Sequence, residues 1–106
     1  RGELRVRCLM HVAQPDLPGA VALGMRSGFG DAWLRFGGLK LFADGALGSE
    51  SAEMLTHYEG RRHTGIATIE RELLDELVRT ANLNGIAVII HAIGDAANRK
   101  VLDAIA

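Results

Sequence analysis

Several residue types are scarce in this sequence of 106 residues, and each scarcity excludes something. Cys8 is the single cysteine, so no internal disulfide can form, and a lone cysteine suits a reducing compartment such as the cytoplasm. The formal net charge is only −1 and the basic residues are scattered, which argues against binding to nucleic acid or to an anionic membrane. No apolar run approaches the ~18 residues of a membrane-spanning helix. We therefore expect a soluble, cytoplasmic chain.

Apolar residues, in contrast, make up 48% of the sequence and are organised in alternating strand-like and helix-like stretches. The patterns predict strands over residues 4–12, 34–42 and 86–91 and a short helix from about residue 17 that closes near residue 28. They also predict a clear helix over 69–83, ended by a left-handed conformation at Asn84-Gly85, and a last helix that starts at Asp95 as its N-cap. The apolar run that ends at His91 has no polar alternation, as in a strand buried on both faces. This order predicts an α/β fold with a parallel sheet, either doubly wound or a (β/α) barrel.

Residues 43–65 form a long stretch without periodicity, and such stretches in compact domains are often functional. The chain opens into a strand-like pattern and stops inside an apparent helix. We therefore interpret residues 1–106 as a single segment from the interior of a longer protein.

Lys40 is a lysine inside the apolar run LRFGGLKLFADGALGS. Alternation places it on one face of the strand with Phe36 and Phe42, and Leu39 and Leu41 on the other. In a barrel, Lys40 would face the interior, where burial would favour a neutral, nucleophilic amine. That amine suits a Schiff base or a metal-bridging carbamate; the structural alternative is a lysine that reaches solvent or pairs with Asp44.

His91 ends the next apolar strand, and in parallel α/β folds that end of the strand is the ligand face. A neutral imidazole there suits a metal ion, although a histidine bonded to a backbone carbonyl explains the pattern equally well. Because Lys40 and His91 end successive strands, we expect both to face the same cleft.

The remaining polar residues have weaker signals. Asp44 could orient Lys40, contact substrate or support the loop. Asp95 could cap its helix or hydrogen-bond a group that supports a metal ligand. Ser49 lies in the long loop, where substrate contact and plain solvation are equally credible. His11 is expected to end the first strand and is a weaker ligand candidate. His57 and His63 are expected to be exposed to solvent, and Cys8 is predicted to be a buried thiol. The sequence contains no HxH, CxxC, HExxH, GxSxG or phosphate-loop motif.

The segments GGLKLFADGALGS and HAIGD, together with the helix between them, closely resemble the middle of the metal-dependent amidohydrolase superfamily. The resemblance is to its amidohydrolase-3 branch, which contains N-substituted formamide deformylase-like proteins. It implies a partial (β/α)8 TIM-type barrel with about three parallel strands. It also implies that Lys40 is carboxylated and binds metal and that His91 is a second metal ligand, with one or two divalent ions, commonly zinc.

The implied activity is hydrolysis of a non-peptide C–N bond in a small amide-type substrate by metal-activated water. The family's other ligand motifs are absent from this chain, so no catalytic residue is assigned within it and the isolated chain is expected to be inactive. Glu50 also stands where family members commonly have arginine. A Schiff-base aldolase is the alternative enzyme class. A non-catalytic module that self-associates through exposed sheet edges is the structural alternative.

Overall fold

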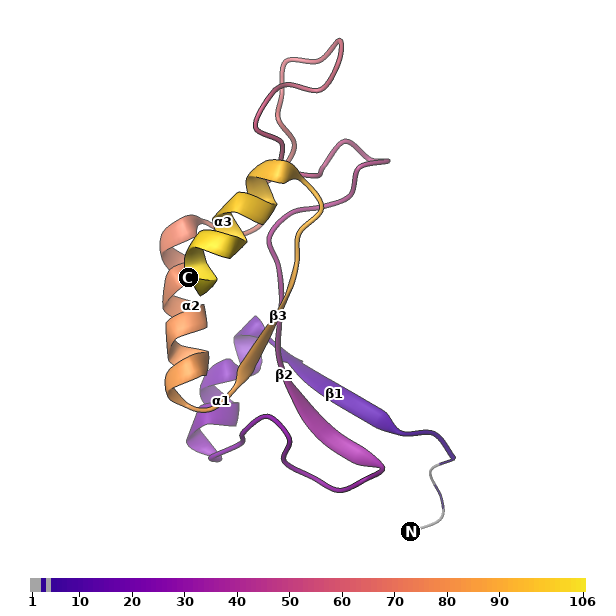
Figure 1. Cartoon of the computed structure of the whole chain (residues 1–106), viewed down its shortest axis with the longest axis vertical. Helices are drawn as coiled ribbons and strands as arrows, with labels where there is room; N and C mark the ends of the chain where they lie inside the picture. The colour runs from indigo at the N-terminus through magenta and orange to yellow at the C-terminus, as the bar shows by residue number, and fades with distance from the viewer. Residues whose placement is uncertain (1–2, 4) are drawn as a thin grey trace. The chain divides into compact units, whose positions relative to one another are not determined.

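The computed structural model describes residue 3 and residues 5–106. The elements follow the order β1 (Cys8–Ala13), a 3-10 turn η1 (Gln14–Asp16), α1 (Leu17–Ala22), β2 (Leu34–Phe42), α2 (Arg71–Leu83), β3 (Ala87–His91) and α3 (Asp95–Ile105) (Figure 1). The three parallel strands form one sheet in the order β1-β2-β3. The predicted α/β class with parallel strands is therefore confirmed.

The chain divides into two compact units, which are described separately. The first comprises the described residues up to Lys40 together with Arg79–Ile89, and the second comprises Leu41–Val78 together with Ile90–Ala106. Strands β2 and β3 and helix α2 each contribute residues to both units.

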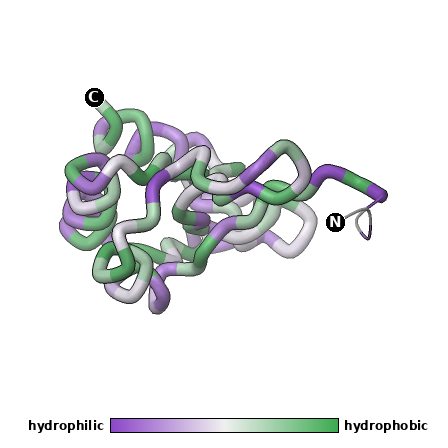
Figure 2. The backbone as a smooth tube through the Cα atoms, turned by 90° about the horizontal axis from the view of Figure 1, so that it is seen from below, coloured by the Kyte–Doolittle hydropathy of each residue, from purple (hydrophilic) through white to green (hydrophobic). Residues whose placement is uncertain are grey.

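Strands β1 and β2 of the first unit pair in parallel from Cys8, opposite Leu34, to Ala13, opposite Lys40. The predicted bounds of β2 are confirmed, whereas the first strand begins later than residue 4. Hydropathy already alternates in the described residues before β1 (Figure 2). Strand pairing starts only at Cys8 because its partner strand begins at Leu34. Leu4 lies outside the described residues.

Helix α1 is shorter than predicted because a glycine ends it. The helix stops at Ala22, and Gly24 follows with φ of 70°, a left-handed conformation that glycine adopts without steric cost. Leu17 and Ala20 are the buried residues of this helix. The expectation that the helix closes near Gly28 was therefore wrong.

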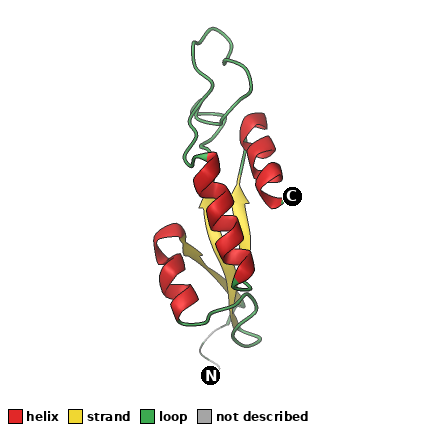
Figure 3. Cartoon of the chain, turned by 90° about the vertical axis from the view of Figure 1, so that its left-hand side faces the viewer, coloured by secondary structure: helices red, strands yellow, loops and turns green. Residues whose placement is uncertain are grey.

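The second unit has a core of apolar side chains from the end of β2, the long loop and the helices. Its buried members are Leu41, Ala43, Ala52, Ile69, Leu74, Leu77, Val78, Ala97 and Val101. Helix α2 begins at Arg71, two residues later than predicted, and Gly85 after it has the expected left-handed φ of 70°. Residues 43–70 contain no helix or strand (Figure 3), as the lack of periodicity indicated.

Strand β3 differs from the sequence-based expectation in its burial. Ala87 is exposed and the four residues after it are only half-buried, so the strand is not buried on both faces. The strand lies at one end of the described strand order, with β2 as its only neighbour among the described strands. An unbroken apolar run therefore predicted the strand correctly but not its surroundings.

Candidate functional site

Lys40 lies on β2, two residues before the strand ends, and belongs to the first unit. The neighbouring Leu39 is fully buried and Leu41 is 2% exposed, whereas Lys40 is half-buried. Burial therefore alternates over these three residues, whereas Phe36, predicted on the same face as Lys40, is buried and Phe42 is exposed.

His91 is the last residue of β3, and both its backbone and its ring are held by the segment that follows β2. Its carbonyl accepts a hydrogen bond from the Ala43 N–H at 2.8 Å. Its Nε2 lies 2.7 Å from the Gly45 carbonyl oxygen, and the Phe42 ring packs beside the imidazole at 5.4 Å between centroids. A carbonyl oxygen can only accept, so Nε2 carries a proton, and in the neutral ring Nδ1 then has the lone pair.

Asp44 is the buried polar residue of this unit, with 2% of its surface exposed. Its carboxylate accepts three backbone hydrogen bonds, from Glu53 at 2.8 Å, Ile93 at 3.0 Å and Gly94 at 2.7 Å. Burial acts to raise the pKa of this carboxyl, but the three donors and the nearby imidazole outweigh it, so the pKa lies below its ordinary value. One Asp44 oxygen is 3.6 Å from Nε2 of His91.

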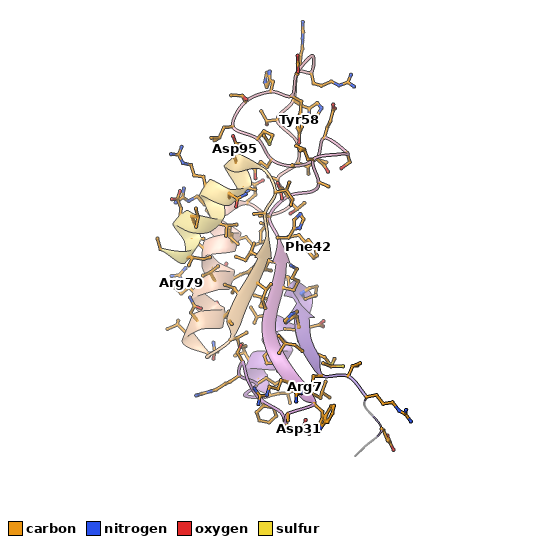
Figure 4. The ribbon with its side chains drawn as sticks, turned by 45° about the vertical axis from the view of Figure 1, so that its right-hand side comes forward. Arg7, Asp31, Phe42, Tyr58, Arg79 and Asp95 are labelled. Carbon is orange, nitrogen blue, oxygen red and sulfur yellow. The ribbon has the colours of Figure 1, made fainter. Side chains whose placement is uncertain are left out.

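Asp95 is at the start of α3, next to the long loop that carries Tyr58 (Figure 4). It was predicted as the N-cap, but Gly94 occupies that position and Asp95 is the first helical residue. The Asp95 carboxylate accepts the N–H of Ala96 at 2.8 Å and the N–H of Leu55 at 2.7 Å. Through its bond with Leu55, Asp95 ties the long loop to the start of the helix.

Glu53 is the residue through which the loop covers the start of α3. Its backbone carbonyl accepts the N–H groups of Ala96 at 3.1 Å and Ala97 at 3.3 Å. Its carboxylate pairs with Lys100 at 2.7 Å, and the two side chains are 22% and 12% exposed. A Cβ on Gly94 would lie 1.8 Å from the Glu53 oxygen, so only glycine fits there.

The other predicted residues lie elsewhere. Ser49 is exposed in a turn, where its hydroxyl is 2.6 Å from the Ser51 hydroxyl and donates to the Ala46 carbonyl at 3.2 Å. His57 and His63 are exposed as expected, and Cys8 is half-buried rather than buried. His11 lies inside β1 and not at its end.

Glu50 has a left-handed backbone, with φ of 53°. It pairs with Arg61 at 3.2 Å and lies 3.6 Å from His63. In this chain the glutamate therefore joins two parts of the loop.

The structure thus brings Asp44 and His91 together, while Lys40 is in the other unit. Sequence reasoning missed Glu53, Lys100 and the carbonyl of Gly45. The ion pair joins residues 47 positions apart, and no local pattern signals such a partner. In the part of the chain that the structure describes, no group of three His, Cys, Asp or Glu side chains could hold a metal ion, and no helix is long and apolar enough to cross a membrane.

Comparisons with known proteins identify the class. The family model described as "Amidohydrolase family" matches residues 2–106, so the chain belongs to the amidohydrolase family. The chain is 43% identical over 74 residues to YtcJ of Bacillus subtilis (strain 168), which is named as an amidohydrolase, and 42% identical over 72 residues to the Arabidopsis thaliana protein LONG AFTER FAR-RED 3. These alignments cover 69% and 67% of this chain but only 14% and 12% of the two relatives.

Two solved structures are similar over 97% of this chain. They are uncharacterized metal-dependent hydrolases from Pyrococcus furiosus, at 30% identity, and Pyrococcus horikoshii OT3, at 33% identity, each with a TM-score of 0.88. This chain covers 22% and 21% of those chains. The resemblance found in the sequence is confirmed at the level of the family, and the three strands with their helices are consistent with part of a TIM-type barrel.

Proposed function

We propose that this chain is part of a metal-dependent hydrolase that cleaves a C–N bond in a small, non-peptide amide substrate. Membership of the amidohydrolase family and the similarity to two metal-dependent hydrolases support the hydrolase class. The observation that carries the proposal in this chain is the arrangement of His91. A metal-ligating histidine characteristically donates its other ring N–H to a carbonyl or carboxylate, and His91 donates Nε2–H to Gly45.

His91 would hold a divalent ion, zinc or another, through Nδ1. Lys40, carboxylated on its amine, would supply a second, anionic ligand, and two ions are within the proposal. Such an ion activates water for attack on a carbonyl carbon. The chain's own contribution is to keep one imidazole nitrogen protonated and the other available. Asp44, Ser49 and Asp95 are proposed to support the ligands or the substrate loop.

The isolated chain is proposed to lack activity. The described residues contain no complete metal-ligand group, and two ligands leave an ion without the three protein ligands that a catalytic zinc site usually has. Hydrolysis of simple amides or formamides by the pure chain, above a Lys40→Ala control, would contradict this. The aldolase alternative gains no support from the family relationship. The free thiol Cys8 is compatible with the further proposal of a cytoplasmic location.

Zinc titration by calorimetry tests the ligand assignment. The wild-type chain is expected to bind zinc, and Lys40→Ala and His91→Ala are each expected to weaken binding by at least about tenfold. His57→Ala is the matched control, because His57 is an exposed histidine of the long loop, and it should bind like the wild type. Zinc binding that survives both ligand substitutions unchanged, or fails in the wild type, would contradict the assignment.

A further inference from the structure

The carboxylate of Asp44 occupies a fixed position beside the His91 ring. Its three backbone donors come from two separate segments, the long loop at Glu53 and the turn after β3 at Ile93 and Gly94. Both oxygens are engaged, Oδ1 by Ile93 and Oδ2 by the other two donors. A buried group with this many directed bonds has little freedom to rotate. Asp44 therefore ties the long loop at Glu53 to the turn after β3, and its own position is fixed by both.

The next residue, Gly45, presents its carbonyl to the histidine. Its N–H donates to the Ser51 carbonyl at 3.0 Å, and a Cβ on Gly45 would lie 2.1 Å from the Ser51 hydroxyl oxygen. The peptide is thus held between Asp44 on one side and Ser51 on the other. The result is a carbonyl 2.7 Å from Nε2 of His91.

The same carboxylate also fixes the chain just after His91. Through Ile93 and Gly94 it holds the turn that leads from β3 into α3, while the Ala43 N–H holds the His91 carbonyl. The backbone on both sides of the histidine is therefore tied to the segment 43–45. In addition, one Asp44 oxygen is 3.6 Å from Nε2, where a negative charge favours a proton on that nitrogen.

We propose that Asp44 is the positioning residue of His91: by fixing the Gly45 carbonyl and the turn after β3, it keeps the proton on Nε2 and makes Nδ1 the nitrogen available to a ligand. The use of Nδ1 by a metal rests on the proposed function, but the position of the proton does not. An alternative is that Asp44 only stabilises the loop, in which case its substitution would leave the ratio of the two His91 tautomers unchanged.

The tautomer of His91 can be read from the imidazole ¹⁵N shifts and their couplings in long-range ¹H–¹⁵N spectra of the metal-free chain, with His91→Ala to assign the signals. The spectra are recorded at about pH 8.5, where a free imidazole is neutral. The wild type should have the Nε2–H form. In Asp44→Asn the ratio of Nε2–H to Nδ1–H should fall by about five- to tenfold, as expected for the loss of one oriented hydrogen bond.

Lys100→Met is the control, because it breaks the ion pair with Glu53 in the same unit without touching the histidine, and it should leave the His91 signals unchanged. A folded Asp44→Asn chain with the wild-type pattern would overturn the proposal, as would an equal change in Lys100→Met. If Asp44→Asn does not fold, Gly45→Ala should give the same fall in the ratio, because its Cβ would collide with the Ser51 side chain and move the Gly45 carbonyl from its position at His91. The double variant Gly45→Ala with Ser51→Gly should restore the wild-type ratio. An unchanged spectrum in the single variant Gly45→Ala would also overturn the proposal.

The two proposals fail separately. A wild-type chain with the Nε2–H form but no zinc binding would contradict the metal assignment and leave the positioning role supported. Zinc binding through His91 with an unaffected tautomer in Asp44→Asn would contradict the positioning role alone.

Discussion

The Asp44 carboxylate is buried in the second unit, accepts three backbone hydrogen bonds and has a pKa below its ordinary value because of those bonds. In the unfolded chain the pKa returns to about 3.9. Above that pH the ionised carboxylate contributes its full stabilisation, and this contribution is lost as the pH falls through the lower folded pKa. The free energy of unfolding should therefore decrease as the pH falls below the pKa of the unfolded carboxyl.

Urea unfolding between about pH 7 and about pH 3 checks this expectation. The wild type should lose part of its free energy of unfolding below about pH 4. Asp44→Asn, which cannot ionise, should be less stable at neutral pH and should lose less on acidification. Parallel curves for the two chains would show that the carboxylate does not carry this pH dependence.

Gly94 is the second residue with a specific requirement, since a side chain there would meet the Glu53 carbonyl. Gly94→Ala should reduce the free energy of unfolding by about 1–3 kcal/mol, the usual range for overpacking. Gly48 has open space around its Cβ position, so Gly48→Ala should be neutral or stabilise by up to about 1 kcal/mol. Equal losses for the two glycines in urea unfolding would refute the close contact.

Among the elements, helix α2 has one face buried in the core and the other exposed to solvent. Two adjacent leucines differ in this respect, since Leu74 is fully buried and Leu73 is 38% exposed. Leu74→Ala should cost about 2–5 kcal/mol through lost burial and a cavity. Leu73→Ala should cost about 1 kcal/mol or less. The comparison uses thermal or urea unfolding, and a reversed order would mean that the helix is rotated from the described position.

At the scale of the whole molecule, β1 is an edge of the described sheet and pairs with β2 alone in the described strand order. Its Leu9 and Met10 are 62% and 59% exposed, and Met10 also lines an apolar cavity of about 300 Å³ with Phe29 and Phe36. Exposed apolar edge strands promote pairing between chains. We propose that the isolated chain self-associates through this edge.

Sedimentation velocity across a range of protein concentrations tests this proposal. The wild type should show concentration-dependent association, and Met10→Lys should reduce it because a charge on an edge strand opposes pairing. Leu83→Lys is the control, as Leu83 is 80% exposed at the end of α2 and should associate like the wild type. A monomeric wild type, or equal association of both variants, would contradict the edge as the interface.

The accuracy of prediction from sequence depended on whether a signal was local. The bounds of β2 and the glycine stop at Gly85 were predicted because alternation and left-handed glycine are properties of a few adjacent residues. The start of β1 was not, since it depends on the pairing with β2, and the burial of β3 was not, since it depends on what covers the faces of the strand. Asp95 was assigned to the N-cap because the sequence does not show that the Glu53 carbonyl accepts the N–H groups of Ala96 and Ala97 at the start of this helix.

What the sequence determined by itself is the order of strands and helices, the family, and the two side chains, Lys40 and His91, proposed to bind metal. These depend on residue types and on spacing along the chain. The tertiary structure decided which nitrogen of His91 is protonated and what the Asp44 carboxylate contacts. Those outcomes are set by hydrogen bonds between segments about fifty positions apart, such as Asp44 with Gly94, and a bond of that kind exists only when folding brings donor and acceptor within about 3 Å.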